Sequence, residues 1–215
     1  MPIPAASLSR QPCRALPPLT LAPGLEIARA RAHEFCGPAR RTLALIAARA
    51  TTGPVIWIAP AWSAERLHPD GVLRLIEPGR LIFAHPARAP DLLWSMEEAL
   101  RAGAAALVVA ELPEPPRLTP VRRLHLAAET GAAEGPVAPT GLILTPGDGG
   151  APGVETRWHI APAHAGGRSR WRLERRRARQ APPASFTLTP ATGGGFAAIH
   201  ASDTGAAPAW AGITD

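Results

Sequence analysis

The chain has 215 residues and a formal net charge of +6, and all 23 of its Lys and Arg positions are arginine. No apolar run reaches the roughly 18 residues that a membrane helix needs, and the first residues lack the continuous apolar region of a signal peptide. The two cysteines, Cys13 and Cys36, have no metal-site spacing and do not indicate a disulfide framework. These features exclude the membrane and disulfide-rich classes, and we expect a cytoplasmic protein without a bound metal.

Composition divides the chain into three parts. Residues 1–24 are rich in proline and lack hydrophobic periodicity, which predicts a flexible N-terminal arm. Residues 191–215 are small and rich in glycine, which predicts a flexible C-terminal tail with an apolar end at 209–213. Residues 25–190 remain as one folded domain.

Within that domain, short apolar runs alternate with segments of helical periodicity. We predict buried strands over residues 31–36, 55–58, 81–84, 105–110 and 141–145. We predict helices over residues 41–50, 91–102 and 118–130. This βαβα alternation predicts an α/β fold, in which a mostly parallel, doubly wound sheet forms the middle of three α/β/α layers.

After Gly153 the helical patterns stop. Residues 156–160, 170–177 and 185–189 have the composition of strands, which predicts antiparallel strands added to the edge of the sheet. The middle strand lies within residues 168–179, where seven arginines and one glutamate carry as much net charge as the whole chain, +6. Such a local basic patch indicates a polyanion or an acidic protein as a partner.

The first predicted strand is followed by a Gly-Pro pair and an apolar helix, where a phosphate-binding loop lies in nucleotide-binding proteins. That loop needs the pattern G-x-x-x-x-G-K-[ST], in which backbone N–H groups hold phosphates and the lysine contacts the β- and γ-phosphates. Residues 37–42 read GPARRT, which is two or three residues short and lacks both the second glycine and the lysine. The degenerate loop contains Gly37, Pro38, Arg41 and Thr42. Because the planar guanidinium of Arg41 is a poor substitute for lysine in a tight loop, we predict no nucleotide cofactor.

The segments around this loop resemble RecA. Residues 33–38 (HEFCGP) followed by residues 42–45 (TLAL) resemble its strand, phosphate loop and helix with the loop partly deleted. Residues 80–83, 91–103 and 107–111 resemble RecA elements in the same order, namely a strand, a helix and the Walker B strand. The resemblance implies a RecA-like core.

The details of this resemblance are closer to the ImuA branch in residues 92–101 and 121–129. Members of that branch are RecA-like accessory proteins encoded with the Y-family-like protein ImuB and an error-prone replicative-type polymerase. The resemblance covers about residues 25–180 of this sequence, and Trp94–Arg101 is its most specific part.

The catalytic parts of a RecA-type ATPase are not carried over. Its acidic general base would fall within residues 58–62 (IAPAW), which contain no carboxylate and have Ala61 at that position. Its nucleotide-sensing glutamine would fall near residues 145–146, which are Thr-Pro. Glu111 matches the Walker B acid in type, and the alternative is a strand-end acid satisfied by a nearby helix. One carboxylate without the other parts cannot organise Mg-ATP, so we expect a protein that is not an enzyme.

The arginine-rich strand is the candidate binding site. We expect its side chains to contact the phosphate backbone of DNA, with a tryptophan stacking on a base. The candidate residues are Arg170, Trp171, Arg172, Arg175, Arg176 and Arg177. The alternative is a solvated edge strand that uses charge to prevent aggregation.

Taken together, the resemblance implies a non-catalytic, RecA-like adaptor in SOS-induced, error-prone translesion DNA synthesis. Its implied partners are an ImuB-like Y-family protein, an error-prone polymerase and single-stranded or primer-template DNA at the nucleoid. The alternative is a cell-division inhibitor of the SulA type, a family that also resembles a RecA core without its phosphate loop and that acts by protein–protein binding. The arginine-rich strand favours the first interpretation.

Overall fold

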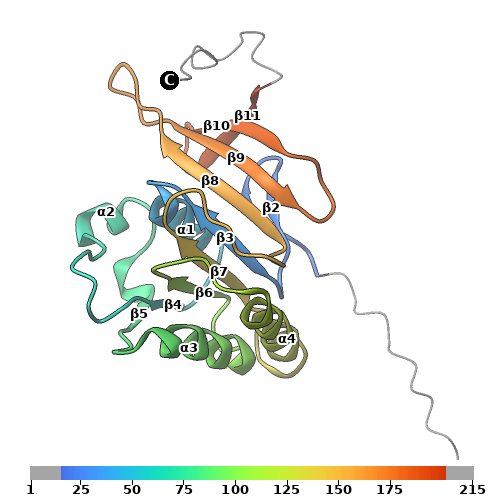
Figure 1. Cartoon of the computed structure of the whole chain (residues 1–215). Coiled ribbons are helices and arrows are strands. Elements are labelled where there is room, and N and C mark those ends of the chain that lie inside the picture. Colours follow the sequence, from blue (N-terminus) through green and yellow to red (C-terminus); the bar gives the residue numbers. More distant parts are fainter. Residues whose placement is uncertain (1–15, 202–215) are drawn as a thin grey trace, which may run out of the picture.

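The structure is a computed structural model, and it describes residues 16–201 (Figure 1). Its large sheet contains the strands β3 (Ala32–Cys36), β4 (Val55–Ile58), β5 (Leu81–Ala84), β6 (Leu107–Glu111), β7 (Thr140–Thr145), β8 (Thr156–Pro162), β9 (Trp171–Ala178), β10 (Ala184–Pro190) and β11 (Phe196–His200). Their order across the sheet is β11-β10-β9-β8-β3-β7-β6-β4-β5. The six neighbouring strands β8, β3, β7, β6, β4 and β5 are parallel to one another, whereas β9, β10 and β11 each run antiparallel to their neighbours.

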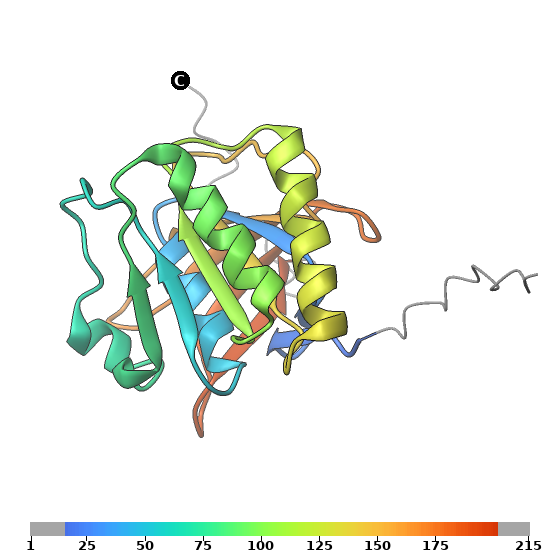
Figure 2. The same ribbon diagram turned by 90° about the horizontal axis from the view of Figure 1, so that it is seen from below.

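Helices cover both faces of the parallel part, which gives three layers. The helices α3 (Ala89–Ala102) and α4 (Leu118–Glu134) pack side by side on one face (Figure 2). The other face carries α1 (Arg40–Arg49), the short α2 (Pro69–Leu73) with a 3-10 turn (Pro78–Arg80), and a hairpin of β1 (Leu19–Ala22) and β2 (Leu25–Ile27). The predicted α/β class with a mostly parallel sheet is confirmed.

The core is divided by the sheet into two apolar clusters. Successive side chains of β6 point to opposite faces, so Val109 packs towards α1 while Val108 packs towards α3 and α4. Both valines are fully buried, as the apolar composition of that strand predicts. The helix α3 follows the predicted signals closely: Asp91 lies in its first turn, and Gly103 ends it in the left-handed conformation with φ +55°.

The strand β8 differs from the sequence prediction because it runs parallel to β3. A parallel connection needs a crossover, which is usually a helix, but here residues 146–155 return across the sheet without one. The fully buried carboxylate of Glu34 holds this segment by accepting hydrogen bonds from the backbone N–H groups of Gly150 and Ala151. The prediction of three antiparallel strands is therefore wrong for the first of them.

The strand β9 is also not at the edge of the sheet, because β10 and β11 lie outside it. The edge-strand alternative for the arginine-rich segment is therefore wrong. Because β9 lies between β8 and β10, its arginine side chains lie beside side chains of both neighbouring strands.

Two strands lie inside segments for which composition predicted tails. The strand β1 falls within residues 1–24, and its Leu19 and Leu21 are buried in the cluster with α1. The strand β11 falls within residues 191–215 and pairs with β10. Both strands are too short to show periodicity, so the predicted boundaries at 24 and 191 are wrong. The predictions for residues 1–15 and 202–215, including the apolar end, lie outside the described residues. Within residues 16–201, no helix has the length and apolar character to cross a bilayer.

Candidate functional site

The carboxyl ends of β3 and β6, with β7 between them, lie at the same edge of the sheet, where the degenerate loop and Glu111 are found. The helix after β3 packs on one face and the helix after β6 packs on the other. Open α/β sheets bind ligands at such a switch point. Arg41 and Glu111 line a hollow of about 230 Å³ there, which is smaller than the roughly 300 Å³ of the smallest typical ligand pockets.

The backbone N–H groups of the degenerate loop are already used within the protein. The N–H of Gly37 donates to the carbonyl oxygen of Gly147 at 2.9 Å, and the N–H of Ala39 donates to that of Ile160 at 3.2 Å. The N–H of Arg40 donates back to Gly37, and Pro38 has no N–H. A phosphate-binding loop needs such donors free to point at the ligand, so this loop cannot bind phosphates in its present conformation.

Glycine is required at position 37 by close packing. Gly37 has φ +89°, and a Cβ atom there would lie 2.4 Å from the carbonyl oxygen of Ile160. The loop is therefore pressed against the end of β8. This contact explains the glycine without any bound ligand.

The guanidinium of Arg41 is paired with the carboxylate of Glu111. Its Nε and Nη2 donate to Oε2 of Glu111 at 2.9 and 2.5 Å. The other carboxylate oxygen, Oε1, accepts from Nε1 of Trp57 at 2.8 Å. Nη1 of Arg41 reaches Glu65 at 2.6 Å. Burial by itself lowers the pKa of Arg41, but the hydrogen bonds and charge of Glu111 and the charge of Glu65 raise it overall, so the Arg41 guanidinium stays protonated.

The residues present do not fit a Mg-nucleotide. Glu111, which the resemblance to RecA matches with the Walker B acid, is paired with Arg41, and residues 58–62 contain no other acid. Thr42, which the same resemblance matches with the metal-binding hydroxyl, lines a different hollow from Glu111. Within residues 16–201, no cluster of three or more histidine, cysteine, aspartate or glutamate side chains has the arrangement of a metal site. Arg41 and Glu111 were predicted separately from the sequence, whereas Trp57 was not predicted, since no spacing rule links side chains on three different elements.

The arginines predicted to bind DNA do not share one face of β9. Arg175 lies on the face that packs towards α1, where its guanidinium is 5.6 Å from the ring centre of Trp158 and Nε donates to the carbonyl oxygen of Pro182. Arg172 and Arg176 lie on the opposite face, on either side of Glu174. Arg177 is exposed at the end of the strand, and Arg170 precedes its start.

The charges on this opposite face are largely paired. Arg176 donates to Glu174 at 3.0 Å and to Asp148 at 2.7 Å, and Arg172 lies 3.1 Å from the same Glu174 carboxylate. The hydrogen bond from Arg176 lowers the pKa of Asp148. The strand therefore does not present the uniform row of arginines that alternation along the sequence suggested.

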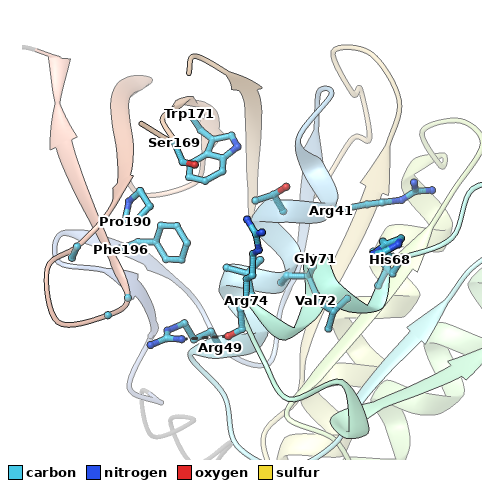
Figure 3. A pocket seen from close by; sticks show the side chains of 17 residues that line it. Arg41, Arg49, His68, Gly71, Val72, Arg74, Ser169, Trp171, Pro190 and Phe196 are labelled. Atoms are coloured by element: carbon cyan, nitrogen blue, oxygen red, sulfur yellow. Dashed lines mark hydrogen bonds between the residues drawn. The ribbon is translucent and has the colours of Figure 1, made fainter. Parts of the chain in front are cut away.

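Trp171, which was also predicted to bind DNA, lines a groove that is larger than the hollow beside Glu111 (Figure 3). This groove lies between α1, α2 and the ends of β9 and β11, and its volume is about 570 Å³. Ring contacts hold Trp171 in place, since its ring centre is 6.0 Å from that of Phe196 and 5.3 Å from that of His164. Trp171 was among the residues predicted from the sequence, but the groove could not be predicted, because its walls come from segments far apart in the chain.

A scan of the chain against models of protein families finds no match, and a search of curated proteins finds none. The resemblance to RecA and ImuA therefore stays a hypothesis, and the site is interpreted from its own geometry.

Proposed function

We propose that the protein is a non-catalytic adaptor with a RecA-like core that acts in error-prone translesion DNA synthesis. The observation that carries this proposal is the ion pair between Arg41 and Glu111, the residue that the resemblance to RecA matches with the Walker B acid. If the core is RecA-like, this pair closes its nucleotide site, and such a fold is suited to supply surfaces to other molecules.

The topology supports the RecA-like part of the proposal. The chain passes from β3 through a short loop to α1, and later from β5 through α3 to β6, the order that the resemblance implies. Both the loop and Glu111 lie at the carboxyl edge, where such folds bind ligands. The absence of a base at residues 58–62 agrees with loss of the whole machinery.

The proposed partners are an ImuB-like protein and an error-prone polymerase, with DNA as a further partner. The pairing of Arg172 and Arg176 with Glu174 weakens the argument from charge for direct DNA contact. Protein binding is therefore the first activity to test. A SulA-type division inhibitor is the second candidate. The arginines of β9 favoured a DNA-related function over this alternative, and their pairing with Glu174 weakens that preference.

Two measurements test this proposal. Isothermal titration of the full chain with Mg-ATP should show no heat of binding, whereas micromolar binding would contradict the closed site. Co-purification with an ImuB-like protein should persist after ATP is removed enzymatically, and failure to co-purify under any condition would refute the adaptor role. Filamentation of cells on overexpression, without DNA damage, would instead support the SulA-type alternative.

A further inference from the structure

The groove beside Trp171 combines an apolar wall with cationic side chains. Its apolar side chains include Leu45, Val72 and Phe196. Among residues 16–201, its charged or titratable lining consists of Arg41, Arg49, Arg74 and His68, with no aspartate or glutamate. Figure 3 shows the side chain of Arg74, which follows the last residue of α2, extending into the groove. The volume of about 570 Å³ is large enough to enclose bulky side chains of a partner.

The cations in this groove differ in how far they are already engaged. Arg41 is paired with Glu111, and Arg49 donates weakly to the carbonyl oxygen of Leu75 at 3.4 Å. Arg74 is exposed and makes no hydrogen bond or ion pair within residues 16–201. The groove thus presents one open guanidinium above an apolar surface, and its electrostatic complement is a carboxylate next to an apolar group.

The geometry favours a protein segment over a nucleic acid. Single-stranded nucleic acids need a track of cations and aromatic faces open for stacking. Here the rings of Trp171 and Phe196 pack against each other at 63°, and Phe196 is only 9% exposed. Together they form a wall for an inserted apolar side chain, and beside it lies Arg74, which has no hydrogen bond or ion pair within the described part of the chain.

We propose that this groove binds an acidic segment of a partner protein, which inserts a bulky apolar side chain against Trp171 and Phe196 and pairs a carboxylate with Arg74. The proposal concerns the surface and the chemistry of its ligand, and it does not depend on the identity of the partner or on the closed nucleotide site.

The test uses the full chain and fluorescein-labelled peptides in a fluorescence polarisation titration. The probe is Glu-Asp-Leu-Trp-Asp-Glu, with Lys-Lys-Leu-Trp-Lys-Lys and Glu-Asp-Gly-Gly-Asp-Glu as the charge and apolar controls. We expect the probe to bind about tenfold or more tightly than either control, which corresponds to one charge-assisted contact or one buried side chain. Absence of binding, or equal binding of all three peptides, would overturn the proposal.

Two variants connect binding to the groove. Arg74→Glu should weaken probe binding about tenfold or more, whereas Arg122→Glu, which reverses an exposed arginine on α4 away from the groove, should leave it within about twofold. Gly71→Trp should block the groove without disturbing the fold, because a Cβ atom at Gly71 meets nothing within 4 Å. Unchanged binding by both groove variants would overturn the proposal, provided that circular dichroism shows them folded.

A labelled oligo(dT) strand of roughly 12 nucleotides, within the site sizes of single-strand binders, distinguishes the other class of ligand. We expect Arg74→Glu to leave oligonucleotide binding unchanged. Oligonucleotide binding that Arg74→Glu abolishes, with no binding of the acidic peptide, would assign the groove to nucleic acid and refute the protein segment.

Discussion

Replacing Arg41 by methionine should destabilise the protein because it leaves the Glu111 carboxylate buried with one remaining donor. In the native structure Glu111 accepts two hydrogen bonds from Arg41 and one from Trp57. The side chain of Glu111 is only 11% exposed, so solvent can replace the lost donors only in part. The second ion pair of Arg41, with Glu65, adds little, since the Glu65 side chain is 70% exposed.

The magnitude follows from these contacts. Two charge-assisted hydrogen bonds contribute roughly 1.5–3 kcal/mol each, and breaking a fully buried ion pair costs about 3–5 kcal/mol. The Arg41 side chain is 23% exposed and borders a hollow, so we expect a loss of about 2–3 kcal/mol in the free energy of unfolding. Adding Glu111→Gln removes the stranded charge and keeps an acceptor for Trp57, so the double variant should be no less stable than Arg41→Met.

The assay is urea unfolding of a double-mutant cycle, followed by far-UV circular dichroism. The four proteins are the wild type, the two single variants and the double variant, and stabilities are compared at a common m value. We expect a coupling energy of about 2 kcal/mol. Arg122→Met, at an exposed position on α4, is the control and should change stability by less than about 0.5 kcal/mol. If the sum of the two single effects equals the effect of the double variant within about 0.5 kcal/mol, Arg41 and Glu111 are not energetically coupled, and the prediction is refuted.

Three further predictions follow from buried groups. Glu34→Gln should lower the free energy of unfolding by about 3–5 kcal/mol in thermal unfolding, since it removes the ionic partner of Arg157, whose side chain is only 19% exposed. Glu98→Gln, at an exposed ion pair, should cost under about 1 kcal/mol; similar losses from the two variants would refute this. Burial lowers the pKa of His33 from 6.5 to about 4. The contribution of neutral His33 to the free energy of unfolding, up to about 3 kcal/mol, is therefore complete above pH 6.5 and is lost as the pH falls through 4. The stability of His33→Gln should change less than that of the wild type between pH 7 and pH 4.5, and an equal change would contradict this prediction. Gly131→Ala should destabilise by about 1–3 kcal/mol in urea unfolding, because its Cβ would lie 2.0 Å from a carbonyl oxygen of α3, whereas Gly71→Ala meets open space and should cost nothing.

Many elements of the parallel sheet could be predicted from local patterns. The strands at 55–58 and 81–84 have the predicted bounds, and α3 differs from its prediction by two residues at its start. The prediction that the strand at 81–84 is buried is wrong, because β5 forms an edge of the sheet and leaves Ile82 and Phe83 exposed. These segments have local signals, namely continuous apolar runs for strands and Asp91 with Gly103 for the helix. The strand β1 and the helix α2 were missed because four or five residues are too few for a period to appear.

The candidate site also has one feature that could be predicted from the sequence and one that could not. The loss of the phosphate loop is visible in residues 37–42, because length and residue type alone exclude the pattern. That Arg41 then binds Glu111 is not visible, since the two residues are 70 positions apart and meet only when β3 and β6 share an edge. Arginines at 172, 175 and 176 also appear as one patch in sequence, whereas the pleat separates them and Glu174 and Asp148 neutralise part of their charge.

By itself, the sequence determined the class of the fold, the positions of its main strands and helices, and the absence of a complete phosphate-loop pattern in residues 37–42. These properties depend on residues that are neighbours in the chain, so hydrophobic period and turn chemistry are enough. Tertiary structure decided the direction of β8, the partner of Glu111 and the groove beside Trp171. Each of these depends on which distant segments the sheet brings together, and the free energy of that choice is spread over many contacts rather than encoded in any short run of residues.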